Sequence, residues 1–182
     1  MRSPSTPLIV VLDSNVLFAR WSRFALQRLA ARPGPPFVPF WSEWIIAETW
    51  RTLASLWLDR TARSSEIDGL SLTRAANDML RYLLVVMRLV SLREYVGTGP
   101  WPELADVDDR PIWQTAVVAG AQYVVSQNVR HFPPLVQGRH LYRDIEYLTA
   151  VEFIEDVLGE SAAAAHSGPL PTGSSLRSGR QR

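Results

Sequence analysis

Residues 8–13, with the sequence LIVVLD, form the stretch that decides the fold. Five consecutive apolar residues, three of them β-branched, are typical of a strand buried on both faces of a parallel sheet. The strand ends at Asp13, and residues 16–31 then carry apolar side chains at helical spacing until a Pro-Gly-Pro-Pro run at 33–36 stops the pattern. A strand, a polar turn and a helix in this order predict the first unit of an α/β fold.

A helix followed by a strand is predicted near the other end of the chain. Three aspartates at 106, 108 and 109 suit the positive end of a helix, and Pro111 suits its first turn. The helix is expected to end near Gly120, and Tyr123–Ser126 is expected to be a strand. This order of helix and strand also fits an α/β fold.

The rest of the pattern alternates in the same way. Further strands are predicted at 37–41, 89–92 and, weakly, at 140–142; further helices are predicted at 42–59, 72–87 and, from a capping box at Thr149 and Glu152, at 149–158; residues 97–102 are predicted to be a loop. We expect a flexible leader at 1–7, one domain at 8–158 and a disordered tail at 159–182, where the composition offers no core.

Composition excludes several classes of function. The 182 residues include no Cys, so thiolate catalysis and cysteine-based zinc sites are excluded. All 19 basic side chains are Arg, so Walker-A phosphate binding and Schiff-base chemistry are excluded as well. The formal net charge of +1 does not by itself indicate a nucleic-acid binder. No stretch reads as a signal peptide or a membrane span, and a cytoplasmic protein with no membrane contact is expected.

Acidic and amide side chains are expected to meet at one edge of the sheet. Asp13 and Asn128 each follow a predicted strand, Asp108 and Asp109 begin a helix that packs on the same sheet, and Glu48 can reach this edge from its own helix. Carboxylates brought together repel one another unless a cation holds them, and hard oxygen ligands select Mg²⁺ or Mn²⁺. Such a metal activates water and stabilises charge on a phosphate, which suits phosphodiester hydrolysis.

Three segments of the chain resemble the acidic motifs of PIN domains. They are residues 12–17 (LDSNVL), 42–48 (SEWIIAE) and 106–126, in the same order and with matching spacing. The resemblance covers roughly residues 8–158 and is closest to bacterial PIN proteins of the VapC type, which are described as toxins of toxin–antitoxin pairs. It implies a three-layer α/β/α sandwich with a mostly parallel sheet and the activity of a metal-dependent endoribonuclease.

The resemblance also implies a set of site residues. Asp13, Glu48 and Asp109 match the first three acidic positions and would bind one or two Mg²⁺ or Mn²⁺, with Asp108 and Asp106 as alternatives to Asp109. Asn128 stands where the family has its fourth acid, which leaves that position and a second metal open. Asn15, Arg110 and Arg130 are the candidate RNA contacts, and an antitoxin and a second copy of the chain are the candidate protein partners.

Simpler interpretations of these residues remain open at this point. Asp13 can be a plain helix cap, and the aspartates before Pro111 can serve only the helix dipole. Glu48 can form an ion pair with Arg51, Asn128 can be a turn residue, and His131 fits a structural role in a loop better than a ligand role. The competing function is a PIN-like module without catalysis that binds RNA or a protein.

Overall fold

The computed structural model describes residues 6–63, 69–93 and 107–167. Its strands are β1 (Leu8–Leu12), β2 (Phe37–Ser42), β3 (Arg88–Val90), β4 (Tyr123–Val125), β5 (Leu135–Val136), β6 (Arg139–Tyr142) and β7 (Ile145–Leu148). Its helices are α1 (Ser14–Phe18), α2 (Arg20–Ala30), α3 (Glu43–Arg63), α4 (Gly69–Val86), α5 (Arg110–Ala119), α6 (Ala150–Glu152) and α7 (Ala162–Ser167). Shorter turns of helix are η1 (Val107–Asp109), η2 (Val129–His131) and η3 (Phe153–Val157).

The described strands form one sheet of seven, in the order β3-β2-β1-β4-β7-β6-β5. The five neighbouring strands β3, β2, β1, β4 and β7 run parallel to one another. β6 and β5 extend the sheet beyond β7 in antiparallel fashion. β1 lies between β2 and β4, which explains its continuous apolar sequence: Val10 and Val11 are fully buried on opposite faces. The predicted α/β class with a mostly parallel sheet is therefore confirmed.

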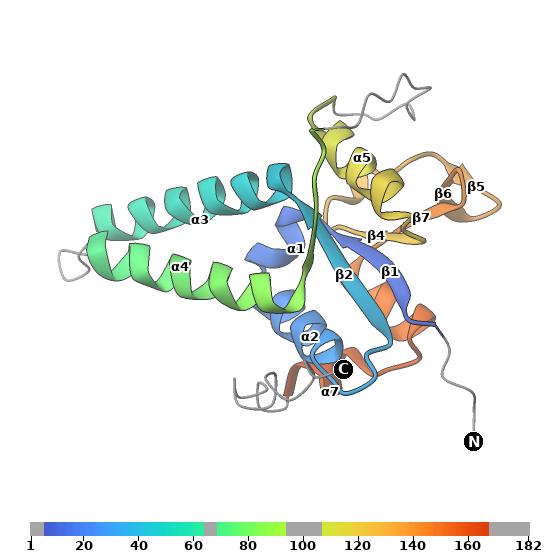
Figure 1. Cartoon of the computed structure of the whole chain (residues 1–182), viewed down its shortest axis with the longest axis horizontal. Helices are drawn as coiled ribbons and strands as arrows, with labels where there is room; N and C mark the ends of the chain where they lie inside the picture. The colour runs from blue at the N-terminus through green and yellow to red at the C-terminus, as the bar shows by residue number, and fades with distance from the viewer. Residues whose placement is uncertain (1–5, 64–68, 94–106, 168–182) are drawn as a thin grey trace.

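Helices cover both faces of this sheet (Figure 1). On one face, the ring of Phe153 packs against Phe37 of β2 and Tyr123 of β4, with ring centroids 5.1 and 5.7 Å away. On the other face, Trp113 of α5 is buried and makes an edge contact with Tyr142 of β6 at 5.2 Å. This arrangement is compatible with three α/β/α layers.

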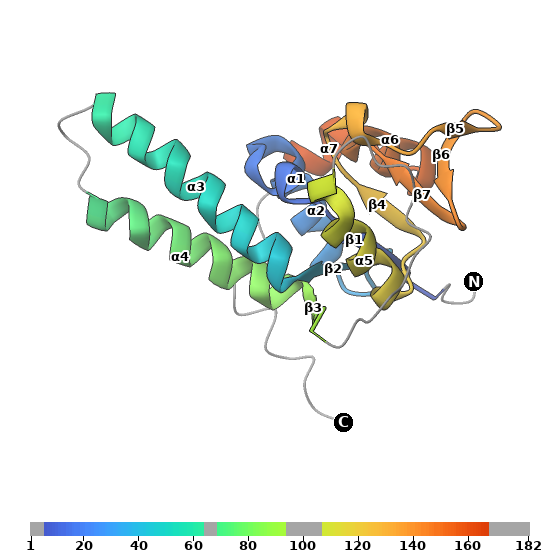
Figure 2. The same cartoon turned by 90° about the horizontal axis from the view of Figure 1, so that it is seen from above.

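A pair of long helices projects from the sheet. α3 begins where β2 ends, α4 returns beside it, and both extend well beyond the other elements (Figures 1 and 2). The first turns of α3 lie against α1 and α5 at the carboxyl ends of the strands. α3 thus carries side chains from the sheet edge outward.

Several predicted elements are confirmed. β1 has the predicted bounds, α5 ends at Gly120 in a left-handed conformation (φ 64°) before β4, and Thr149 and Glu152 form the capping box of α6. In each case the signal is local: an apolar run, a glycine with positive φ, or a side chain that satisfies a helix end. The predicted loop at 97–102, Asp106, residues 1–5 and residues 168–182 lie outside the described residues.

The predicted helix over residues 16–31 is in fact two helices. Ala19 adopts an extended conformation (φ −68°, ψ 114°) that separates α1 from α2. The carbonyls released at the break are satisfied by side chains, since Ser22 donates to the carbonyl of Val16 at 2.7 Å and Arg23 donates to that of Leu17 at 2.9 Å. Apolar periodicity continued across the break and concealed it.

β7 was missed by the sequence prediction. It pairs with β4 and β6, and Glu146 at its centre is buried. Glu146 forms a two-pronged ion pair with Arg139 on β6, which compensates its burial. The β6–β7 turn places Arg143 and Asp144 at φ 49° and 65°, as in a tight two-residue hairpin. The sequence of β7 has a charged residue inside the strand, and the turn before it has no Gly or Asn. The usual sequence signals of a buried strand and of a hairpin turn are therefore absent.

The ordered chain also extends further than predicted. α7 lies within residues expected to be disordered, and it packs Ala162 and Ala165 against α2. Arg32 and Glu160 form an ion pair at 2.7 Å beside this contact. Small alanine side chains allow two helices to approach closely, although they give no strong apolar signal in the sequence. Within the described ranges, no helix is both long enough and apolar enough to cross a membrane.

The contact between α2 and α7 gives a direct test of this added helix. Ala165 is 1% exposed, so we expect Ala165→Leu to overpack the interface and lower the free energy of unfolding by about 1–3 kcal/mol. Ala164 is exposed on the same helix, so Ala164→Leu should change it by less than about 0.5 kcal/mol. Urea unfolding of the two variants measures this, and equal effects would show that α7 does not pack as described.

Candidate functional site

A cavity of about 380 Å³ lies where β1 ends and α3 begins. Its lining includes four carboxylates from three separate segments of the chain, together with polar and aromatic side chains. The lining residues are Asp13, Ser14, Asn15, Phe18, Trp44, Glu48, Arg51, Asp108, Asp109, Asn128 and His131. The structure thus brings together the acids and the amide that the sequence predicted to meet.

Asp13 is the most buried of these acids, with 4% of its surface exposed. Its backbone N–H donates to the carbonyl of Val125 at 3.0 Å, so β1 and β4 fix its position. Burial raises the pKa of its carboxyl group, the hydrogen bond from Ser126 partly opposes this, and the charge of Asp109 raises the pKa further. The carboxylate is therefore held where its negative charge is unfavourable.

Three donors surround the Asp13 carboxylate. Ser126 donates to Oδ2 at 2.8 Å, Asn15 donates to Oδ2 at 2.5 Å, and Ser14 donates to Oδ1 at 3.2 Å. Asn15 also joins the two strand ends, because its Oδ1 accepts the backbone N–H of Gln127 at 2.8 Å and its Nδ2 contacts Ser126 at 2.9 Å. Asn15, predicted as a substrate contact, therefore lines the cavity with its amide already engaged.

Glu48 reaches the cavity from the second turn of α3. Partial burial raises the pKa of its carboxyl group, and the nearby charge of Asp13 raises it further. A hydrogen bond with Ser14 and the charge of Arg51 act in the opposite direction. Burial and the charges of neighbouring acids thus raise the pKa values of both Asp13 and Glu48, as expected for acids that share one site.

Asp109 and His131 meet on the opposite wall. The imidazole Nδ1 of His131 lies 2.8 Å from Oδ2 of Asp109, and the side-chain nitrogen of Asn128 lies 2.9 Å from the same Nδ1. Because a carboxylate only accepts, we assign Nδ1–H as the donor to Asp109, so the side-chain nitrogen of Asn128 lies against this ring nitrogen without donating a hydrogen bond to it. His131 was predicted to be a structural loop residue; the structure places it in the cavity, where it orients an acid.

The hydroxyl of Tyr147 lies beneath these residues. Tyr147 is 6% exposed, and among the described residues its hydroxyl has no hydrogen-bond partner. It lines a narrow space of about 10 Å³ with Asp13, Asp109 and Asn128. Burial raises the pKa of Tyr147, as do the charges of Asp109 and Asp13, so the hydroxyl stays protonated and is a potential donor toward the acids.

The capping interpretation does not account for the acids. Asp13 and Asp109 occupy the N-cap positions of α1 and α5, yet neither makes a side-chain capping hydrogen bond. Asp13 is directed to Ser126 and Asn15, and Asp109 is directed to His131. Their side chains face the cavity and not the helix ends.

The described oxygen ligands in the cavity are of the type that a hard divalent cation prefers, but their side chains are not arranged around a common metal position. Carboxylate oxygens crowded in a partly buried space favour Mg²⁺ or Mn²⁺, and burial, together with the charges of neighbouring acids, raises the pKa values of Asp13 and Glu48, a cost that a cation would relieve. However, in the part of the chain that the structure describes, no three His, Asp or Glu side chains form a group that could hold a metal ion. The predicted metal cluster is not preformed, because hydrogen bonds to Ser126 and His131 direct the carboxylates of Asp13 and Asp109.

Two predicted phosphate contacts lie elsewhere. Arg110 at the start of α5 and Arg130 in η2 are exposed, and neither lines the cavity. The arginine that does line it is Arg51. The sequence offered no signal to choose among the arginines, because the choice depends on how α3 approaches the ends of β1 and β4.

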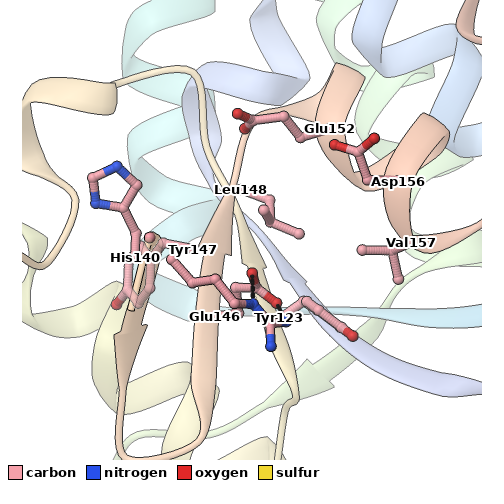
Figure 3. Close-up of a pocket in the computed structure, with 10 residues that line it drawn as sticks. Tyr123, His140, Glu146, Tyr147, Leu148, Glu152, Asp156 and Val157 are labelled. Atoms are coloured by element: carbon pink, nitrogen blue, oxygen red, sulfur yellow. Dashed lines mark hydrogen bonds and ion pairs between the residues drawn. The ribbon is translucent and has the colours of Figure 1, made fainter. Parts of the chain in front are cut away.

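A larger cavity of about 480 Å³ lies near β6, β7 and η3. Glu152 and Asp156 lie above Glu146 in Figure 3, and the charged groups are largely engaged. Arg139 is paired with Glu146, and Glu152 accepts from the backbone and hydroxyl of Thr149. These contacts hold β6 to β7 and cap α6, so we assign this cavity a structural role.

The buried charge of Asp13 predicts a dependence of stability on pH. A folded-state pKa above the unfolded value weakens the fold when the carboxyl group is ionised, and this loss disappears as pH falls through the raised pKa. We therefore expect Asp13→Asn, in EDTA, to gain stability relative to the wild type as pH rises from 3.8, the ordinary pKa of an aspartate, to 7.5. Urea unfolding at both values measures the difference, and a difference that stays constant or reverses would contradict the assignment.

Similarity to other proteins adds nothing to this picture. No family model matches the chain, and comparisons with curated proteins and with solved structures give no match. The function therefore has to be argued from the chemistry of the cavity at the end of β1.

Proposed function

We propose that the chain is a PIN-type, metal-dependent endoribonuclease that hydrolyses RNA phosphodiester bonds. The observation that supports this most strongly is the convergence of Asp13, Glu48, Asp108 and Asp109 on one open cavity at the carboxyl ends of parallel strands. The described residues that line the cavity include no Cys and no Lys, and the hydroxyl of Ser14 is buried and donates to Asp13, so water is the natural nucleophile.

Asp13, Glu48 and Asp109 would hold the metal, with Asp108 as an additional or alternative ligand. When bound, Mg²⁺ or Mn²⁺ supplies an activated water and stabilises the negative charge that builds up on the phosphate. Ser126 and Asn15 fix the carboxylate of Asp13, and His131 orients that of Asp109. Asn128, proposed as a catalytic residue, lies against the imidazole of His131 and offers an amide to water or substrate.

A second candidate function has one observation in its favour. Asn128 replaces a charged residue, and Asp109 is hydrogen-bonded to His131, so the acids do not already form a metal-binding group. A catalytically inactive PIN-like module that binds RNA or protein would tolerate this arrangement. The buried carboxyl group of Asp13 and the half-buried one of Glu48, each with a pKa raised by burial and by a neighbouring acid, favour the enzyme, because a module without catalysis gains nothing from them.

The resemblance to VapC-type proteins extends the proposal to a biological role. The chain would be the toxin of a toxin–antitoxin pair in the cytoplasm, with RNA as substrate. A small antitoxin protein and a second copy of the chain would be its partners.

Cleavage of labelled RNA by the purified protein tests the proposed function. With Mn²⁺ or Mg²⁺ we expect cutting that EDTA abolishes and that Asp13→Asn, Glu48→Gln and Asp109→Asn each reduce by about 100-fold or more, because each removes a ligand from the charged site. Asp78→Asn on the exposed face of α4 is the matched control and should cut at the wild-type rate.

The outcomes separate the two candidate functions. RNA binding without cleavage, unaffected by EDTA, would support the inactive module and contradict the nuclease. Cleavage that survives all three substitutions would indicate a contaminating enzyme and leave the acidic cavity without a role.

A further inference from the structure

Trp44 leaves much of its indole exposed beside the acidic cavity. Its side chain lines that cavity and is 40% exposed, whereas Trp41 and Trp113 are buried at 0% and 2%. An exposed indole at the rim of a polar cavity offers apolar surface to a ligand. Stacking of an unpaired nucleobase is the contact that such a face makes in proteins that bind single strands.

Arg51 lies on the same face of α3 as Trp44 and Glu48. Positions 44, 48 and 51 are spaced at i, i+4 and i+7, so the three side chains form one stripe that begins at the acids. The guanidinium carbon of Arg51 lies 5.8 Å from the centroid of the Trp44 ring, within the range of a cation–π contact. The indole and the guanidinium therefore form a single surface.

Arg51 adds a positive charge to a cavity that is rich in carboxylates. The four carboxylates that line the cavity repel a phosphate, and Arg51 is the one arginine among its described lining residues. Arg51 also lines a second cavity of about 400 Å³, which continues along α3 past Thr52 and Ser55 to Asp59. The two cavities share Glu48 and Arg51, so a path from the acids along α3 passes Arg51, with Trp44 beside it at the rim of the first cavity.

We propose that Trp44 and Arg51 form a nucleotide subsite next to the acids. The indole stacks on an unpaired base beside the reacting phosphate, the guanidinium contacts a neighbouring phosphate, and the strand continues along α3. This inference rests on the proposed function, to which it adds the substrate-positioning residues and the direction in which the strand leaves the site. Because stacking is tolerant of sequence, the subsite fixes the position of the strand and not the identity of the base.

Binding of a fluorescein-labelled uridine dodecamer tests the subsite. Anisotropy is measured with Mg²⁺ in an Asp13→Asn background, which prevents cleavage. We expect Trp44→Ala and Trp44→Leu to weaken binding by about 5- to 150-fold, which corresponds to the 1–3 kcal/mol of one stacked base, and Trp44→Phe to retain most of it. Trp44→Leu keeps an apolar side chain on the helix, and melting curves confirm that each variant is folded.

The salt dependence of binding tests Arg51. Arg51→Ala should reduce the slope of log Kd against log salt by about 0.7, the change for one phosphate contact with a single strand, whereas Arg51→Lys should keep the slope. Two exposed residues outside the cavity serve as controls: Leu58→Ala on α3 and Arg81→Ala on α4 should bind as the background does.

Cleavage by the wild type separates failure of the subsite from failure of the function. If the wild type cuts RNA and Trp44→Leu binds and cuts equally well, the subsite is wrong and the nuclease stands. Equal competition by a blunt RNA duplex would also overturn the subsite, because a paired base cannot stack on the indole. If the wild type with metal neither binds nor cuts RNA, both proposals fail.

Discussion

The buried carboxylate of Asp13 is the constraint on which the rest of the structure depends. An ionised group with 4% of its surface exposed requires donors, and Ser126 and Asn15 supply them. Those two residues belong to different strand ends, so satisfying one carboxylate also fixes the separation and register of β1 and β4. The geometry of the cavity follows from that pairing.

Further acidic side chains lie close to Asp13, whose own negative charge is already unfavourable because it is buried. Glu48 arrives from α3 and Asp109 from the turn before α5, and the charges of these acids disfavour ionisation of their neighbours. A fold selected only for stability would place neutral side chains here. This arrangement is expected if the acids bind a cation. In the absence of a cation, the hydrogen bond from His131 holds the carboxylate of Asp109 in place.

Local signals in the sequence were enough for the framework of the fold. The apolar run of β1, the left-handed Gly120 after α5 and the Thr149 capping box each act over a few residues, and all three are present as predicted. β7 depends on its pairing with β4, distant in the sequence, and on the cross-strand ion pair between Glu146 and Arg139, and α7 depends on close packing of alanines. Such features depend on contacts made in the tertiary structure, so local sequence patterns do not predict them.

The candidate site was predictable in its acids and not in its surroundings. Asp13, Glu48, Asp108, Asp109 and Asn128 follow from the rule that polar residues gather at the carboxyl ends of parallel strands. Ser126, His131, Tyr147 and the Trp44–Arg51 pair could be recognised only once β4 was known to lie beside β1 and α3 was known to start at the same edge. Arg110 and Arg130 are exposed and lie outside the cavity lining, so their role as RNA contacts stays a prediction.

Titration calorimetry of Mn²⁺ into the metal-free protein tests the central claim most directly. The account predicts that the wild type binds Mn²⁺, that Glu48→Gln weakens binding by more than about tenfold (about 1.4 kcal/mol), and that Asp156→Asn in the structural cavity has no effect. Absence of binding by the wild type, or equal losses in the two variants, would contradict the claim that the acids at the end of β1 form a metal site.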